Sequence, residues 1–203
     1  MSYDHKITDL KFHINKLIPK FICDSFINFF EDNKESSGVE RSYKFIEKKQ
    51  MEDNFKCINL SYYATIDRKF DEPLEAAKKY IAIMIQNYVL HIQKNICPTF
   101  NNKLICNSPN IRIIKYDVGE SIKDHVDVAV YPSATASGSI RASCTLNLNE
   151  DYDGGEFRFF NGQIKHTFKT GDAMIFPAEP IWIHGTEPIT RGARYAINCF
   201  LHD

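Results

Sequence analysis

The sequence lacks several features that would assign it to a class of protein. It has no cluster of lysine and arginine, and its 25 basic residues nearly balance its 26 acidic ones, so nucleic acid is not an expected partner. No apolar stretch approaches the roughly 18 residues of a membrane span. The first six residues are polar and lack the apolar core of a signal peptide. These absences favour a cytoplasmic protein without a membrane segment.

Paired cysteines are also lacking. The six cysteines are scattered along the chain, and no two of them form a C-x-x-C motif. We therefore expect reduced and mostly buried thiols, as in a cytoplasmic protein. A chain of 203 residues is long enough for one domain with a substantial core, and its 15 Phe and 10 Tyr indicate an aromatic filling of that core.

The first half of the chain mixes strand and helix patterns. Residues 10–18 alternate between apolar and polar and predict an opening strand, whereas residues 21–33 have apolar positions at a helical period. Residues 60–64 predict a short strand. A longer helix is predicted from Leu74 to about Lys94, with Asp71 as its cap and an apolar stripe that packs on a sheet.

From residue 107 onward, strand-like runs alternate with Gly, Pro and Asn. This pattern is typical of an all-β sandwich or a closed sheet. We expect a single domain over residues 1–203, in which residues 1–106 form a strand-and-helix support and residues 107–203 form the β core.

His125-Val126-Asp127 lies in a run that reads as a strand. Side chains at positions i and i+2 of a strand point to the same face, so an imidazole and a carboxylate project together. If the later run that ends at His184 folds back beside it, two imidazoles and one carboxylate meet. This is the facial ligand set of non-haem iron(II) oxygenases. Taken alone, an H-x-D motif also fits a surface histidine beside a turn aspartate.

A second pattern follows ten residues after His184. Residues 192–200 alternate as a strand and place Arg194, Ala196, Asn198 and Phe200 on one face. An arginine on the inner face of a buried strand is costly unless an anion pairs with it, and its planar guanidinium suits a carboxylate. A metal site and an inward arginine together imply a co-substrate that carries a carboxylate.

These motifs resemble, in order and spacing, the catalytic core of 2-oxoglutarate/Fe(II)-dependent dioxygenases, specifically the prolyl 4-hydroxylase-like branch. The resemblance covers a little under half of the chain. It implies a mainly β protein with flanking helices (α+β), whose core is a double-stranded β-helix (jelly roll, cupin-like) supported by N-terminal helices. The matching segments are Tyr116-Asp117-Val118-Gly119-Glu120, His125-Val126-Asp127, residues 148–157, residues 171–177, His184-Gly185-Thr186-Glu187-Pro188 and Gly192-Ala193-Arg194-Tyr195.

The resemblance also implies cofactors and the residues that bind them. Fe(II) would be held by His125, Asp127 and His184, and 2-oxoglutarate by Arg194 and Tyr116, with ascorbate as a candidate reductant. Asn147 stands where the family often has a tyrosine that contacts the far carboxylate of 2-oxoglutarate, and an amide can still donate there. Thr145 and Asn198 are further polar candidates for the co-substrate site.

The implied reaction is the hydroxylation of an unactivated C–H bond by dioxygen, with release of succinate and CO2. The favoured substrate is a prolyl or other side chain of a peptide or protein, and a free amino acid or small molecule is the alternative. Oxidative demethylation of nucleic acid is disfavoured by the balanced charge, and a metal-binding jelly-roll module without turnover is the non-enzymatic alternative. The sequence leaves the oligomeric state open. Candidate substrate contacts are Tyr131, in the loop of residues 130–140, Arg141 and Arg158.

Overall fold

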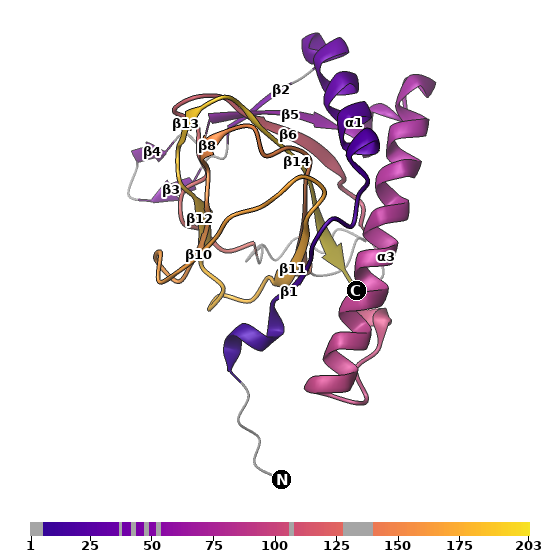
Figure 1. The fold of residues 1–203 in the computed structure, drawn as a ribbon, viewed down its shortest axis with the longest axis vertical. Helices are drawn as coiled ribbons and strands as arrows, with labels where there is room; N and C mark the ends of the chain where they lie inside the picture. The colour runs from indigo at the N-terminus through magenta and orange to yellow at the C-terminus, as the bar shows by residue number, and fades with distance from the viewer. Residues whose placement is uncertain are drawn as a thin grey trace.

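In the computed structural model, the described residues are 6–36, 38–41, 44–46, 49–51, 54–105, 108–127 and 140–203. Their strands form one large sheet and three small ones, one of which faces the large sheet, and every strand pair is antiparallel. Figure 1 shows the strands arranged as a ring, with α1 and α3 together on one flank. This is the jelly roll with flanking helices that the sequence predicts.

The large sheet has seven strands and joins both halves of the chain. Its central strands come from the second half of the chain, whereas strands from the first half form both of its edges. In spatial order the strands are β1 (Phe12–Ile14), β11 (Ala173–Pro177), β7 (Ile140–Asn147), β14 (Arg194–His202), β6 (Arg112–Tyr116), β5 (Asn54–Asn59) and β2 (Gly38–Arg41).

The remaining strands form three small sheets, of which the three-stranded one faces the large sheet across the site described below. Its middle strand begins just after Gly154 and Gly155, and a turn that contains Asn161 and Gly162 joins it to the next strand. The strands are β10 (Ile164–His166), β9 (Phe157–Phe159) and β12 (His184–Thr186); β13 (Ile189–Arg191) with β8 (Asp153–Gly154); and β3 (Lys44–Ile46) with β4 (Lys49–Met51).

The helices cover the outer face of the large sheet. Apolar residues of α1 and α3 pack with those of β7, β11 and β14 into the main core, so the predicted stripe of the long helix does lie on a sheet. The described cysteines form no disulfide with one another. Among the described residues, no helix has the length and apolar character that a membrane crossing requires. The helices are α1 (Lys20–Asp32), α2 (Leu60–Tyr63) and α3 (Asp71–Asn95), with 3-10 turns η1 (Ile7–Leu10), η2 (Lys34–Ser36), η3 (Arg68–Phe70) and η4 (Asn102–Ile105).

Three local predictions are wrong. Leu60–Tyr63 is a helical turn rather than a strand, because the Asn59 side chain caps it by accepting a hydrogen bond from the Tyr62 N–H at 3.0 Å. Asp71 is the first residue inside α3 and not its cap, since the chain enters the helix directly from η3. The opening strand is confined to β1, because Lys16 has a positive φ of 52° that turns the chain away.

A polar cluster fixes the end of α1 to the sheet. The Glu31 carboxylate accepts hydrogen bonds from Lys115 Nζ at 2.8 Å and from the Tyr195 hydroxyl at 2.5 Å. These two bonds outweigh burial and hold the pKa of Glu31 below its ordinary value. Burial first, and then the bond to Glu31, raises the pKa of Tyr195 to about 12. This cluster thus ties the end of α1 to β6 and β14, two strands that line the pocket described below.

Gly171 gives the clearest prediction about stability. It has a φ of +82°, and an added Cβ would lie 2.1 Å from the Ile18 carbonyl oxygen, where the segment after β1 passes. Gly162 has nearly the same φ, +84°, but open space around it. We expect Gly162→Ala to cost about 1–2 kcal/mol of unfolding free energy through backbone strain alone. Gly171→Ala should cost at least about 2 kcal/mol more, because backbone must also move.

Equilibrium urea unfolding of both variants checks this expectation. Gly162→Ala is the matched control, because it shares the positive φ and lacks the contact. Equal losses in the two variants would mean that the segment after β1 does not pack tightly on the turn that precedes β11.

Candidate active site

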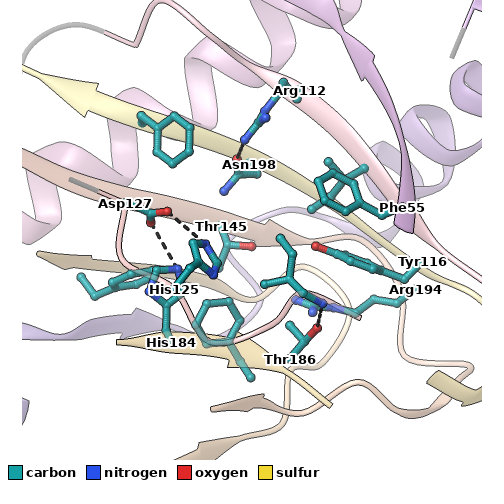
Figure 2. A pocket seen from close by; sticks show the side chains of 15 residues that line it. Phe55, Arg112, Tyr116, His125, Asp127, Thr145, His184, Thr186, Arg194 and Asn198 are labelled. Carbon is teal, nitrogen blue, oxygen red and sulfur yellow. Dashed lines mark hydrogen bonds and ion pairs between the residues drawn. The ribbon is translucent and has the colours of Figure 1, made fainter. Parts of the chain in front are cut away.

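A pocket lies between the large sheet and the three-stranded sheet (Figure 2). It holds about 520 Å3 of space, including the part that opens to solvent. Alternate residues of β6 and β14 face it, as their period of two predicts. Arg112, Ile114 and Tyr116 come from β6, and Arg194 and Asn198 from β14.

His125, Asp127 and His184 converge at one side of this pocket. The carboxylate oxygens of Asp127 lie 3.2 Å from His125 Nε2 and 3.2 Å from His184 Nε2. One candidate ligand atom from each residue lies within 4.8 Å of the others, and no other such group of His, Cys, Asp or Glu occurs in the described part of the chain. The side chain of Asp127 is only 5% exposed. The spatial proximity expected from the sequence is therefore present.

The segment that carries His125 and Asp127 is not the strand that we predicted. Only His125 pairs with a neighbour, in an isolated bridge whose two backbone hydrogen bonds to His184 are each 2.9 Å long. The Ile122 N–H is taken by the Thr186 hydroxyl, so the regular ladder is interrupted before the bridge. His125 and His184 are thus direct partners across the backbone, which brings the two imidazoles together without a continuous strand.

Backbone carbonyls orient both imidazoles. His125 Nδ1 lies 2.8 Å from the Lys123 carbonyl oxygen, and His184 Nδ1 lies 2.9 Å from that of Trp182. A carbonyl oxygen can only accept, so each Nδ1 carries the hydrogen and donates it. In a neutral ring this leaves the lone pair on Nε2, the atom that faces Asp127. Such hydrogen bonds from the second ring nitrogen are the usual support of metal-binding histidines.

Asp127 is held as a carboxylate. Burial alone would raise its pKa, but the adjacent imidazoles of His125 and His184 outweigh burial and hold the pKa of Asp127 well below its ordinary value. The Ser143 hydroxyl of β7 also donates a hydrogen bond to Oδ2. No pattern in the sequence indicates this contact, because Ser143 and Asp127 are 16 residues apart and share no motif.

The three residues fit a divalent metal. Two Nε2 lone pairs and a carboxylate face one another at hydrogen-bonding distance, and a cation between them satisfies all three acceptors at once. Two imidazoles and one carboxylate are the donor set that non-haem iron(II) prefers, with positions left open for other ligands. The ring of Phe157 stacks on His184 at 5.4 Å between centroids, and Phe176 meets it at 4.7 Å, so one side of the centre is apolar.

Arg194 lies at the other end of the pocket and is 2% exposed. Its Nε donates a hydrogen bond to Asn147 Oδ1 at 3.0 Å, which uses one of the five N–H donors of a guanidinium. The guanidinium carbon lies 5.8 Å from the ring centre of Tyr116 and 5.3 Å from that of Phe168. A buried guanidinium between aromatic rings, which has further N–H groups to donate, suits a carboxylate ligand.

The polar residues predicted beside the co-substrate have different positions. Thr145 and Asn198 line the pocket and are register partners on β7 and β14. Asn147 is fully buried, and its amide N–H groups donate to the backbone carbonyls of Asn149 and Lys169. Its oxygen accepts from Arg194, so Asn147 acts on the pocket through that guanidinium.

Of the three predicted substrate contacts, Tyr131 falls outside the described residues. Arg141 is bonded to Asp203 and lines a separate cavity beside α3. Arg158 pairs with Asp124 at 2.8 Å and with Glu187 at 3.0 Å. Neither arginine lines the pocket that contains Asp127.

Several pocket residues were not predicted as site residues, among them Phe55 and Arg112. Phe55 of β5 lines the pocket and packs on Tyr116 at 5.3 Å between ring centroids. Its strand had no clear pattern, and only pairing with β6 brings it to the site. Arg112 lines the pocket and donates a hydrogen bond to Asn198 Oδ1 at 2.6 Å. Arg112 lies on the same face of β6 as Tyr116, but no motif includes it.

Comparison with known proteins agrees with this geometry. Residues 111–202 match the model of the 2OG-Fe(II) oxygenase superfamily. A PKHD-type hydroxylase of Beijerinckia indica is 41% identical over 88 residues, which are 40% of this chain and 38% of that protein. One of Nitrobacter winogradskyi is 40% identical over 91 residues, 42% of this chain and 39% of the relative. The match thus spans about two fifths of the length of these relatives.

Solved structures share the fold over nearly the whole chain. A prolyl hydroxylase of Trichoplax adhaerens, in complex with a peptide fragment of the hypoxia inducible factor, has a TM-score of 0.65 at 16% identity, covering 97% of this chain and 84% of its own. A prolyl-4-hydroxylase of Pseudomonas putida has a TM-score of 0.61 at 16% identity, covering 97% and 96%. The family match therefore covers residues 111–202, a little under half of the chain, and the chain as a whole shares its fold with these hydroxylases.

Proposed function

We propose that the chain is an Fe(II)- and 2-oxoglutarate-dependent dioxygenase that hydroxylates an unactivated C–H bond of a prolyl or other side chain in a peptide or protein. The observation that carries this proposal is the joint placement, in one pocket, of the buried group His125, Asp127 and His184 and of the buried guanidinium of Arg194. The relatives named as PKHD-type hydroxylases and prolyl hydroxylases support the choice of a prolyl side chain.

The pocket residues would have different roles according to their positions. His125, Asp127 and His184 would hold the metal on one face, in the orientation that the Lys123 and Trp182 carbonyls impose on the rings. The bound cofactors supply the oxidation of a C–H bond by dioxygen, with release of succinate and CO2. With these three ligands on one side, the metal would remain accessible to a co-substrate from the pocket.

At the Arg194 end of the pocket, charge and shape would determine how 2-oxoglutarate binds. Arg194 would pair with a carboxylate of 2-oxoglutarate, and Asn147 keeps the guanidinium in place through its Nε. Tyr116 lies against Arg194 and can donate its hydroxyl to the same carboxylate. The apolar wall of Phe157 and Phe176 beside His184 limits water near the centre, which strengthens these charged contacts.

Succinate formation tests the proposal. The full chain is incubated with Fe(II), 2-oxoglutarate and capped proline-containing peptides, and succinate is measured together with the mass gain of one oxygen atom on the peptide. We expect succinate only when both cofactors are present, a higher rate with an accepted peptide, and loss of both products when a chelator removes the metal. A protein that binds the metal and 2-oxoglutarate but forms no succinate is a binding module, which would refute the proposal.

A further inference from the structure

The segment that carries His125 rests on β12 through an interrupted set of hydrogen bonds. His125 and His184 exchange two backbone bonds of 2.9 Å each, and the Thr186 N–H donates to the Ile122 carbonyl oxygen at 2.9 Å. The Ile122 N–H is bonded to the Thr186 hydroxyl instead of a backbone carbonyl. The distance between the two imidazoles therefore depends on how closely residues 122–125 are held against β12.

Gly185 lies between these contacts and lets the segment come close. His184 and Thr186 line the pocket, so position 185 faces the outer side of the three-stranded sheet. A Cβ added to Gly185 would lie 2.7 Å from Asp124 Oδ1 and 2.8 Å from the Ile122 carbonyl oxygen. The missing side chain thus leaves a place over β12 that the Asp124 carboxylate occupies.

Arg158 reaches the same place from the neighbouring strand. It is the register partner of Gly185 in the pairing of β9 with β12, so its side chain lies on the same outer face. Its Nε donates a hydrogen bond to Asp124 Oδ1 at 2.8 Å. Its Nη1 donates to the Thr186 carbonyl oxygen at 3.1 Å and to Glu187 Oε2 at 3.0 Å. One guanidinium therefore joins the segment before His125 to the end of β12.

The chemistry of these contacts suits a clamp between two segments. A guanidinium has five N–H donors in one plane, so it can bond acceptors on two segments at once, which a single ammonium does less well. The side chains of Arg158 and Asp124 are only 19% and 32% exposed, so water screens their pairing less than it screens a fully exposed pair. Glu187 also lies 2.8 Å from Lys165 Nζ, so it keeps a cation if Arg158 is replaced.

We propose that Arg158 is a positioning residue of the metal centre. By bonding Asp124 to the end of β12, it holds His125 at the distance from His184 that a shared metal requires. The inference rests on the proposed function for the identity of the metal. It gives Arg158 a role outside the pocket, in place of the substrate contact that the sequence suggested.

Anaerobic titration of Fe(II) into the full chain tests the role. Arg158→Met keeps the length of the stem and removes the donors, and we expect it to lower the affinity for Fe(II) about tenfold, as loss of a supporting contact does. Arg158→Lys keeps the charge without the planar fork and should lie between Arg158→Met and wild type.

Arg191→Met is the matched control. Arg191 makes the same kind of two-bond pair, with Asp153, from Nε at 2.6 Å and from Nη2 at 3.1 Å. This pair joins β13 to β8 and contacts neither the segment of His125 nor β12. The affinity of Arg191→Met for Fe(II) should stay within twofold of wild type.

Amide hydrogen exchange of the metal-free chain, measured by NMR, separates positioning from general stability. The His125 and Thr186 N–H groups should exchange about tenfold faster in Arg158→Met, because the bonds that protect them cross between the two segments. The N–H of Ile197, in the centre of β14, should keep its rate. Asp124→Ala should resemble Arg158→Met, and the double variant should add little, because each single change removes the same bond.

Three results would each overturn the inference. These are an affinity of Arg158→Met for Fe(II) within twofold of wild type, equally faster exchange at Ile197 and His125, and full additivity of Arg158→Met with Asp124→Ala. Succinate formation by the wild type distinguishes failure of the proposed function. A wild type that binds Fe(II) without forming succinate refutes that function alone, whereas one that binds no Fe(II) refutes both.

Discussion

Asp127→Ala is expected to lower the affinity of the protein for Fe(II) by on the order of a hundredfold or more, and to reduce iron-dependent succinate formation to background. The variant loses the carboxylate that lies between His125 and His184, and two imidazoles alone bind a hard divalent ion poorly. Anaerobic metal titration and succinate measurement check the two parts separately. Retention of metal affinity within a few fold of wild type would mean that the ligands are wrongly assigned.

Ser143→Ala is the graded control for this result. It leaves the Asp127 carboxylate in place and removes only the hydroxyl that donates to it. Loss of such a supporting contact should cost about tenfold in metal affinity, well below the cost of losing the carboxylate. A larger loss in Ser143→Ala than in Asp127→Ala would contradict the assigned order of contacts. Thermal unfolding without metal shows whether either variant is destabilised as a fold.

Arg194→Met is expected to weaken 2-oxoglutarate binding by about a hundredfold while metal affinity stays within about threefold of wild type. Methionine approximates the length of the arginine stem without its charge, so the buried position stays filled. The expected loss corresponds to removal of a charge-assisted pair in a water-poor site. Calorimetric titration of 2-oxoglutarate into the metal-loaded variant measures it. Unchanged affinity would mean that another group anchors the co-substrate.

Two further variants show which neighbours help Arg194 to bind 2-oxoglutarate. Asn147→Ala removes the acceptor for Arg194 Nε and should weaken 2-oxoglutarate binding by about tenfold, because the guanidinium is no longer held. Tyr116→Phe keeps the ring against Arg194 and removes only the hydroxyl. If Tyr116→Phe leaves the affinity for 2-oxoglutarate unaltered, the hydroxyl has no part in binding it.

The sequence predicts best where local periodicity carries the information. The alternation of β14 places Arg194 and Asn198 on one face, and the structure has both in the pocket. Leu146 and Leu148 pack in the core while Thr145 faces the pocket, as their alternation also indicates. These positions are predictable because a strand has only two faces and one of them must be buried.

The sequence predicts poorly where distant segments determine the result. Phe55 reaches the pocket only because β5 joins β6, and nothing in its own stretch shows that pairing. His125 and Asp127 come together on a segment with one bridge rather than a strand, and nearby the Ile122 N–H bonds the Thr186 hydroxyl instead of a backbone carbonyl. The bond from Ser143 to Asp127 likewise depends on chain paths that no local pattern specifies.

The pairing of β1 with β11 bears on how the protein can be shortened. Phe12, His13 and Ile14 cover the outer edge of β11, and the Ile18 N–H donates to the Gly171 carbonyl at 3.1 Å. A truncated form that starts after residue 18 would present a bare, apolar strand edge to solvent, which is a template for pairing between molecules. Expression of the isolated oxygenase segment is therefore expected to yield aggregates, even though that segment contains every residue assigned to the metal.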